Sequence, residues 1–165
     1  MLRKTPFITP CQPTLRKEPP TGLGWLHEVK WDGFRIQIHK DGKHVTLYSK
    51  YGADFTSRYP ALVDAFATKC STRACILDAE LTAIDRDGHP DFGALLKRRL
   101  DSDVCVWVFD VLSIRGQDMQ PLPLITRRYK LDRVMGLHRS GAPLWHLSSG
   151  AAFDLQSERV ASKPR

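Results

Sequence analysis

The sequence EVKWDGFR, at residues 28–35, places Lys30 between two apolar neighbours. Partial burial favours the neutral form of a lysine amine, and a nearby cation such as Arg35 acts in the same direction. A neutral lysine amine is a nucleophile near neutral pH. Gly33 would let the backbone approach a phosphate, which Arg35 could bind through two N–H groups. The alternative is a surface lysine ahead of an ordinary turn.

A second candidate site is the run from Ile76 to Thr82, in which carboxylates alternate with apolar residues. On a strand, Asp78, Glu80 and Thr82 share one face, and the apolar residues share the other. Carboxylates on such a face must be exposed, paired or bound to a ligand. A ribose hydroxyl or a divalent cation would suit them, because magnesium prefers carboxylate oxygen. The alternative is the solvated face of an edge strand.

Two further residues are candidates with weaker signals. Phe109 lies near the end of an apolar run and could stack on a base, which contributes roughly 1–3 kcal/mol. The alternative is that Phe109 belongs to the core. Lys50 precedes Gly52 at the end of a predicted hairpin, and this pair suits either a phosphate contact or a simple turn.

The hydrophobic pattern predicts the elements that carry these residues. Two alternating runs around Asp41-Gly42 predict a hairpin. A helix is predicted over 58–69, with Thr56 or Ser57 as its N-cap and Pro60 in its first turn. Further strands are predicted at 74–84 and 104–112, the second buried on both faces, and helices at 92–100 and 124–136. Strands and helices mixed without strict alternation indicate an α+β domain on largely antiparallel sheet.

Composition narrows the class of protein. The net charge is +7 and the pI about 9.4, which favours a polyanionic partner, although an ordinary basic surface gives the same balance. The basic stretch around Arg127, Arg128, Lys130 and Arg133 is a candidate for weak contacts with DNA phosphates. The four cysteines form no C-x-x-C pair, and no run approaches the ~18 apolar residues of a membrane helix. We therefore expect a cytoplasmic protein without a signal peptide.

Taken together and in their order along the chain, the four sites resemble the nucleotidyltransferase superfamily of DNA ligases, RNA ligases and mRNA-capping enzymes. The likeness is closest to the ATP-dependent ligase domain of bacterial non-homologous end-joining ligases, and it runs from about Pro13 to Arg128. A Lys-x-Asp-Gly tetrad alone arises by chance in about one such chain in a few dozen. Four matching segments in the right order are a more specific signal than the tetrad alone. These segments are 25–35, 54–60, 77–81 and 109–112.

The resemblance implies an ATP-grasp-like nucleotidyltransferase domain of largely antiparallel sheets flanked by helices. It implies that Lys30 attacks the α-phosphate of ATP and becomes a lysyl-adenylate, assisted by Mg²⁺ or Mn²⁺. Asp32, Glu80 and Glu158 are the candidate metal neighbours.

It also implies a nucleotide-binding role for a set of side chains. Glu28 stands where the family holds the adenine, and Arg35 where it contacts ribose or phosphate. Glu80 would bind the ribose, Phe109 would stack on the purine, and Lys50 stands at a phosphate-binding position.

Three departures from the family pattern bear on these roles. Lys50-Tyr51 replaces the usual Arg-Asn pair, which weakens forked phosphate binding. Ala79 replaces a glycine, which is a mild change. Glu158–Lys163 is the candidate for the next motif and carries Arg159 where the family has glycine.

The predicted organisation is a proline-rich lead-in at 1–24, an adenylation-domain core at 25–136, and a weakly patterned tail at 137–165. We expect the end of this domain to be truncated and the OB-fold domain to be absent. The predicted function is that of an ATP-dependent DNA ligase, which forms lysyl-AMP for strand joining in DNA repair and recombination. The expected partners are nicked or broken duplex DNA and a separate OB-fold or end-joining protein, near the nucleoid and without a membrane.

Two alternatives stay open at this point. One is a truncated, catalytically incompetent remnant that binds nucleotide or DNA weakly. The other is an RNA ligase or capping guanylyltransferase, which shares the lysine chemistry but fits the flanking residues less well.

Overall fold

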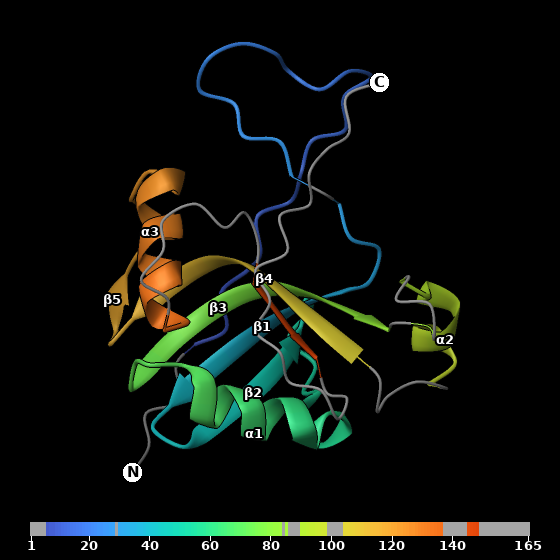
Figure 1. Cartoon of the computed structure of the whole chain (residues 1–165), viewed down its shortest axis with the longest axis vertical. Helices are drawn as coiled ribbons and strands as arrows, with labels where there is room; N and C mark the ends of the chain where they lie inside the picture. Colours follow the sequence, from blue (N-terminus) through green and yellow to red (C-terminus); the bar gives the residue numbers. More distant parts are fainter. Residues whose placement is uncertain are drawn as a thin grey trace.

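The structure is a computed structural model, and it describes residues 6–28, 30–83, 85, 90–98, 104–136 and 145–148. Its strands form one antiparallel sheet in the order β2-β1-β3-β4-β5, with β6 also paired to β4 (Figure 1). The predicted α+β class is confirmed. The elements are β1 (Phe34–Asp41), β2 (His44–Ser49), η1 (Thr56–Arg58), α1 (Pro60–Lys69), β3 (Ala74–Ala83), α2 (Phe92–Leu96), β4 (Val104–Ile114), β5 (Gln117–Asp118), α3 (Leu124–Val134) and β6 (Trp145–Ser148).

The predicted hairpin is confirmed as β1 and β2, with Asp41 paired to His44 next to the turn. Gly42 has a φ of +61°, a left-handed conformation that glycine adopts without a Cβ clash. The predicted N-cap of α1 is wrong. Tyr59 occupies that position, while the Thr56 hydroxyl accepts a hydrogen bond from the Leu47 N–H at 3.1 Å.

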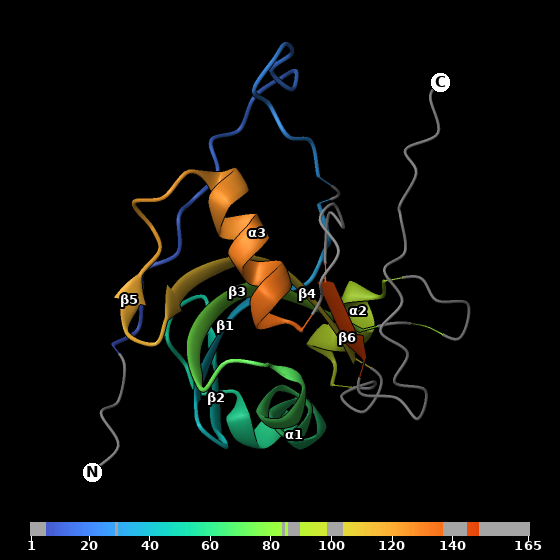
Figure 2. The same cartoon turned by 60° about the vertical axis from the view of Figure 1, so that its left-hand side comes forward.

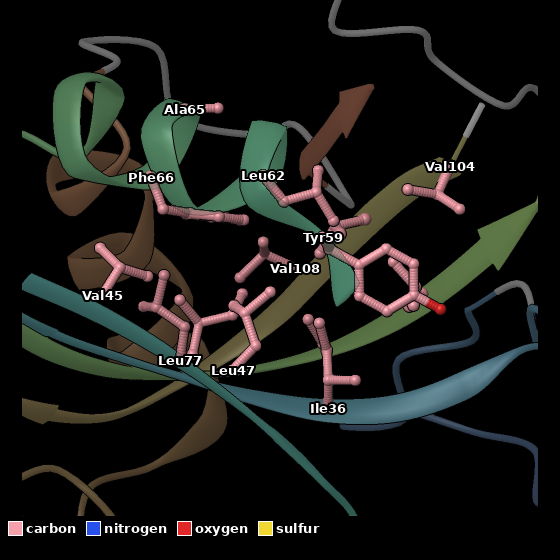
Figure 3. Packing of buried hydrophobic residues seen from close by; sticks show 14 of the residues in the cluster. Ile36, Val45, Leu47, Tyr59, Leu62, Ala65, Phe66, Leu77, Val104 and Val108 are labelled. Carbon is pink, nitrogen blue, oxygen red and sulfur yellow. The ribbon is translucent and has the colours of Figure 1, made fainter. Parts of the chain in front are cut away.

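One face of the sheet packs against α1 and forms the core. Ile36 of β1, Leu77 of β3 and Val108 of β4 point toward Leu62 and Phe66 of α1, and all five are buried (Figure 3). Burial of such side chains contributes about 1.5–3 kcal/mol each. This face sets the register of the strands, because a shift by one residue would turn every apolar side chain away from α1.

The opposite face of the sheet carries polar and aromatic residues. Arg35 of β1 lies opposite Glu80 of β3, and Glu80 lies opposite Trp107 of β4. Trp107, Phe109 and Asp110 are only half-buried, so the prediction that this strand is buried on both faces is wrong there. Figure 2 shows α3 beside β4, and Leu131 and Val134 of α3 belong to the core cluster on the α1 side.

The lead-in crosses this polar face before it leaves the sheet. The Ile8 N–H donates to Gln37 Oε1 at 3.3 Å, and the Gln37 amide donates back to the Ile8 carbonyl. Residues 12–28 are exposed and extend away from the sheet as the loop at the top of Figures 1 and 2. The lead-in is therefore laid over the domain only near its beginning.

Several predicted features lie outside the described residues. They are Ile84 at the end of the strand predicted over 74–84, Leu100 at the end of the second predicted helix, and the tail apart from 145–148. In the described part of the chain, no helix has the length and apolar character needed to cross a membrane.

Candidate nucleotide site

Lys30 lies just before β1, and its side chain is 87% exposed. Its Nζ is 4.0 Å from Asp32 Oδ1, and the Asp32 side chain is itself 73% exposed. The expectation that apolar neighbours would partly bury Lys30 is therefore wrong. Trp31 does not cover the amine but stacks on Trp107, and Val29 lies outside the described residues.

Gly33 brings the turn that follows Lys30 against β3. A Cβ at this position would lie 2.2 Å from the Leu81 carbonyl oxygen and 2.9 Å from its carbon, so a larger residue would force the backbone apart. The Gly33 N–H favours the charged form of the Glu80 side chain. Glycine is thus required here by the close approach of the β3 backbone, whereas the sequence predicted a glycine that lets the backbone approach a phosphate.

Glu80 is a partly buried carboxyl that interacts with the other charged groups of the site. Burial raises its pKa to about 7, while Arg35, Lys30 and the Gly33 N–H favour the charged form and oppose that rise. Arg35 and Glu80 are paired between β1 and β3, and Lys30 is close enough to Glu80 to act on its charge. A carboxyl with a pKa near 7 can hold or release a proton at neutral pH.

Asp78 is bound by Arg35 rather than by solvent. Arg35 Nε donates to Asp78 Oδ1 at 3.0 Å, and Nη2 donates to Oδ2 at 2.7 Å. Asp78 is 3% exposed and lies on β3, an internal strand of the sheet. The alternative of a solvated edge strand is therefore wrong. Burial raises the pKa of Asp78, and the hydrogen bonds from Arg35 oppose that rise.

Phe109 lies at a β-bulge. Asp78 pairs with Asp110, and the next pair is Ala79 with Val108, so Phe109 is an extra residue on β4. Bulges re-aim side chains and are common beside active sites. This bulge explains how Phe109 and Asp110, which are adjacent in sequence, both face the polar side of the sheet.

A pocket of about 200 Å³ opens beside Phe109. The Arg35 guanidinium lies 5.6 Å from the centre of the Phe109 ring, and its Nη1 donates to the Cys11 carbonyl at 2.6 Å. The lead-in therefore forms one wall of the pocket. The lining residues are Ile8, Thr9, Pro10, Cys11, Arg35, Asp78, Phe109, Asp110, Leu112, Gln120 and Arg127.

Two arginines of α3 are held by carboxylates. Arg127 donates to both oxygens of Asp110, with Nη2 at 2.8 Å from Oδ2. Arg128 forms an ion pair with Glu28, two residues before Lys30. The sequence marked both arginines as candidate phosphate contacts, but it gave no sign of these partners. Each pair joins α3 to a distant element.

The sequence model of the family described as the ATP dependent DNA ligase domain matches residues 10–150. The chain belongs to this family. The chain is 33% identical to the multifunctional non-homologous end joining protein LigD of Pseudomonas aeruginosa over 138 residues, which is 80% of this chain and 16% of that protein. It is 41% identical to DNA ligase 2 of Haloquadratum walsbyi over 115 residues, which is 63% of this chain and 18% of that protein.

The fold also agrees with a solved ligase domain. The crystal structure of the ligase domain of Mycobacterium tuberculosis LigD matches with a TM-score of 0.60 and 26% identity, over 78% of this chain and 50% of that chain. The family prediction is confirmed. This chain spans half of that solved domain and less than a fifth of the two curated relatives.

The remaining site predictions for this ligase-family chain are only partly placed by the structure. Lys50 follows β2, and its Nζ lies 5.0 Å from the centre of the Tyr51 ring. Glu158 lies outside the described residues. The described part of the chain contains no group of three or more His, Cys, Asp or Glu side chains that could hold a metal.

Proposed function

We propose that this chain carries the nucleotide-binding part of an ATP-dependent DNA ligase and that Lys30 accepts AMP. The observation that carries the proposal is the pairing of Arg35 with Glu80 close to the exposed Lys30, with the Phe109 pocket next to Arg35. An exposed amine at this place is accessible to a nucleotide phosphate. The Lys30 nitrogen forms a bond to the α-phosphorus while the bond to pyrophosphate breaks.

The pocket volume suggests how the nucleotide lies. About 200 Å³ is below the roughly 300 Å³ or more that encloses a whole small-molecule ligand. The pocket therefore takes the base, stacked on Phe109, and leaves the ribose and phosphates to extend toward Glu80 and Lys30. Glu28 would reach the base from the side of α3, where Arg128 holds it.

Mg²⁺ or Mn²⁺ fits this arrangement. Magnesium is often bound by one or two carboxylates together with substrate phosphates. Glu80 and Asp32 both lie near Lys30, so they could hold such an ion with the triphosphate. When bound, the ion would neutralise charge on the phosphates. Lys50 would contact a phosphate from the end of β2.

The partner that we propose is duplex DNA with a nick or break, with a separate OB-fold or end-joining protein as a second candidate. In α3, Arg127 and Arg128 are bound by Asp110 and Glu28. Lys130 and Arg133 are therefore the better candidates for contacts with the DNA backbone. Such contacts would weaken with salt and would not depend on sequence. Work of this kind would take place in the bacterial cytoplasm, at the nucleoid.

Covalent labelling tests the proposal. The protein is incubated with ATP labelled at the α-phosphate and with Mg²⁺ or Mn²⁺, and the labelled peptide is mapped by mass spectrometry. We expect an acid-labile, base-stable label on Lys30 that Lys30→Ala removes. Lys43→Ala, in the exposed hairpin turn, is the matched control and keeps the label. Label on another lysine, retained in Lys30→Ala, would refute the role of Lys30. No label at all would favour the incompetent remnant.

A further inference from the structure

Trp31, the residue directly after Lys30, stacks face to face on Trp107 of β4. The ring centres are 3.7 Å apart and the planes differ by 11°. Trp31 Nε1 is buried and has no hydrogen-bond partner among the described residues. The orientation of the Trp31 ring therefore depends on the ring beneath it.

Trp107 is itself held in place by a short hydrogen-bond chain. Its indole N–H donates to Thr82 Oγ1 at 2.9 Å, and the same hydroxyl donates to the Cys105 carbonyl at 3.4 Å. Thr82 is fully buried. A hydroxyl that gives its proton to Cys105 presents a lone pair to the indole, so both groups are satisfied.

The turn around Lys30 thus has two anchors on the sheet. Gly33 touches the backbone of β3 at Leu81, and Trp31 rests on Trp107 of β4. Lys30 directly precedes these two contacts in the chain, and its side chain is exposed. Its side chain cannot set the position of the amine by packing, so the position depends on the anchored backbone.

We propose that Trp107 is a positioning residue for Lys30. Its indole supports Trp31 and, through Trp31, holds the Lys30 turn where the amine meets a phosphate. This inference rests on the proposed function of Lys30. A misplacement of about 1 Å at a reacting group can cost about 100-fold in rate. Loss of the support therefore slows the chemical step and leaves the affinity for ATP nearly unchanged.

The test compares four variants of the full chain in single-turnover adenylation with labelled ATP. Trp107→Leu removes the stack, Trp107→Phe keeps an aromatic ring, and Thr82→Val removes the acceptor for the indole N–H. Trp25→Phe is the matched control, since Trp25 is 60% exposed. Circular dichroism reports the exciton couplet of stacked indoles, and hydrogen exchange reports the amides of the Lys30 turn.

We expect Trp107→Leu to lose the couplet and to slow adenylation by about 10- to 100-fold at saturating ATP, with an unchanged half-saturating ATP concentration. Trp107→Phe should recover most of the rate, Thr82→Val should fall between, and Trp25→Phe should match the parent. An unchanged rate in folded Trp107→Leu would overturn the inference. So would equal losses in Trp107→Leu and Trp107→Phe.

Hydrogen exchange separates this inference from the proposed function. If the parent chain takes no label, the role of Lys30 fails, but the anchoring of the turn can still be measured. Faster exchange at Trp31, Asp32 and Gly33 in Trp107→Leu, with unchanged exchange in β1, would support the anchor. Unchanged exchange in the turn would overturn it.

Discussion

Replacing Glu80 with glutamine removes a carboxyl whose pKa burial raises from 4.5 to about 7. The positive charges of Arg35 and Lys30 and the Gly33 N–H favour the ionised form, and burial outweighs them. Glutamine keeps nearly the same shape but does not ionise. The substitution therefore isolates the free-energy cost of holding a charged carboxyl at this place.

The sign and size of the effect follow from the two pKa values. A carboxyl with a raised pKa in the folded state contributes stability below its unfolded pKa and loses it as the pH rises through the folded pKa. For Glu80, this stability is lost between pH 4.5 and about pH 7. The full shift corresponds to an upper bound of about 3 kcal/mol. Solvent screening of this half-buried group reduces the expected effect to about 1–2 kcal/mol.

Urea unfolding at about pH 5 and about pH 8, in chelator-treated buffer, measures this difference. We expect the free energy of unfolding of Glu80→Gln, relative to the parent, to rise by about 1–2 kcal/mol from the lower to the higher pH. Glu18→Gln, at an exposed position of the lead-in, is the control and should show no such rise. Parallel pH profiles for the parent and Glu80→Gln would refute the raised pKa.

Three further substitutions test the rest of the site. Phe109→Leu should weaken ATP binding and cost less than about 1.5 kcal/mol of stability, because Phe109 is outside the core cluster. The measurement is thermal melting with and without ATP. An ATP-induced shift equal to that of the parent would contradict this prediction. Asp78→Ala should cost about 3 kcal/mol in urea unfolding, because it leaves the Arg35 guanidinium without its carboxylate, and a loss below about 1 kcal/mol would show that water replaces the pair. Gly33→Ala should slow adenylation at least about 10-fold by pushing the turn off Leu81, and a parental rate would show that the turn tolerates the shift.

Much of the local structure could be predicted from the sequence alone. The hairpin, the helix with Pro60 in its first turn and the alternation of β3 all depend on residues a few positions apart. The sequence singled out Gly33, but the contact with the Leu81 backbone that requires a glycine there appears only in the folded chain. Hydrophobic periodicity and turn residues predict structure over such short sequence distances.

The β-bulge at Phe109 depended on the tertiary structure. The apolar run Val104–Leu112 predicts a strand buried on both faces, and nothing in it marks the extra residue. The bulge turns Asp110 to the same side as Phe109, toward Arg127 of α3. Simple alternation would have placed these two neighbours on opposite faces.

The sequence alone predicted which residues are candidates for nucleotidyl transfer, and the tertiary structure decided how they are held. Arg35 and Asp78 are 43 positions apart in sequence, and the antiparallel register of β1 and β3 brings them together. The sequence predicted burial for Lys30 from its immediate neighbours, whereas the folded chain turns Trp31 onto Trp107 and leaves the amine exposed. Neighbouring residue types restrict the local backbone, but the exposure and charge partners of a side chain depend on which distant strands and helices surround it.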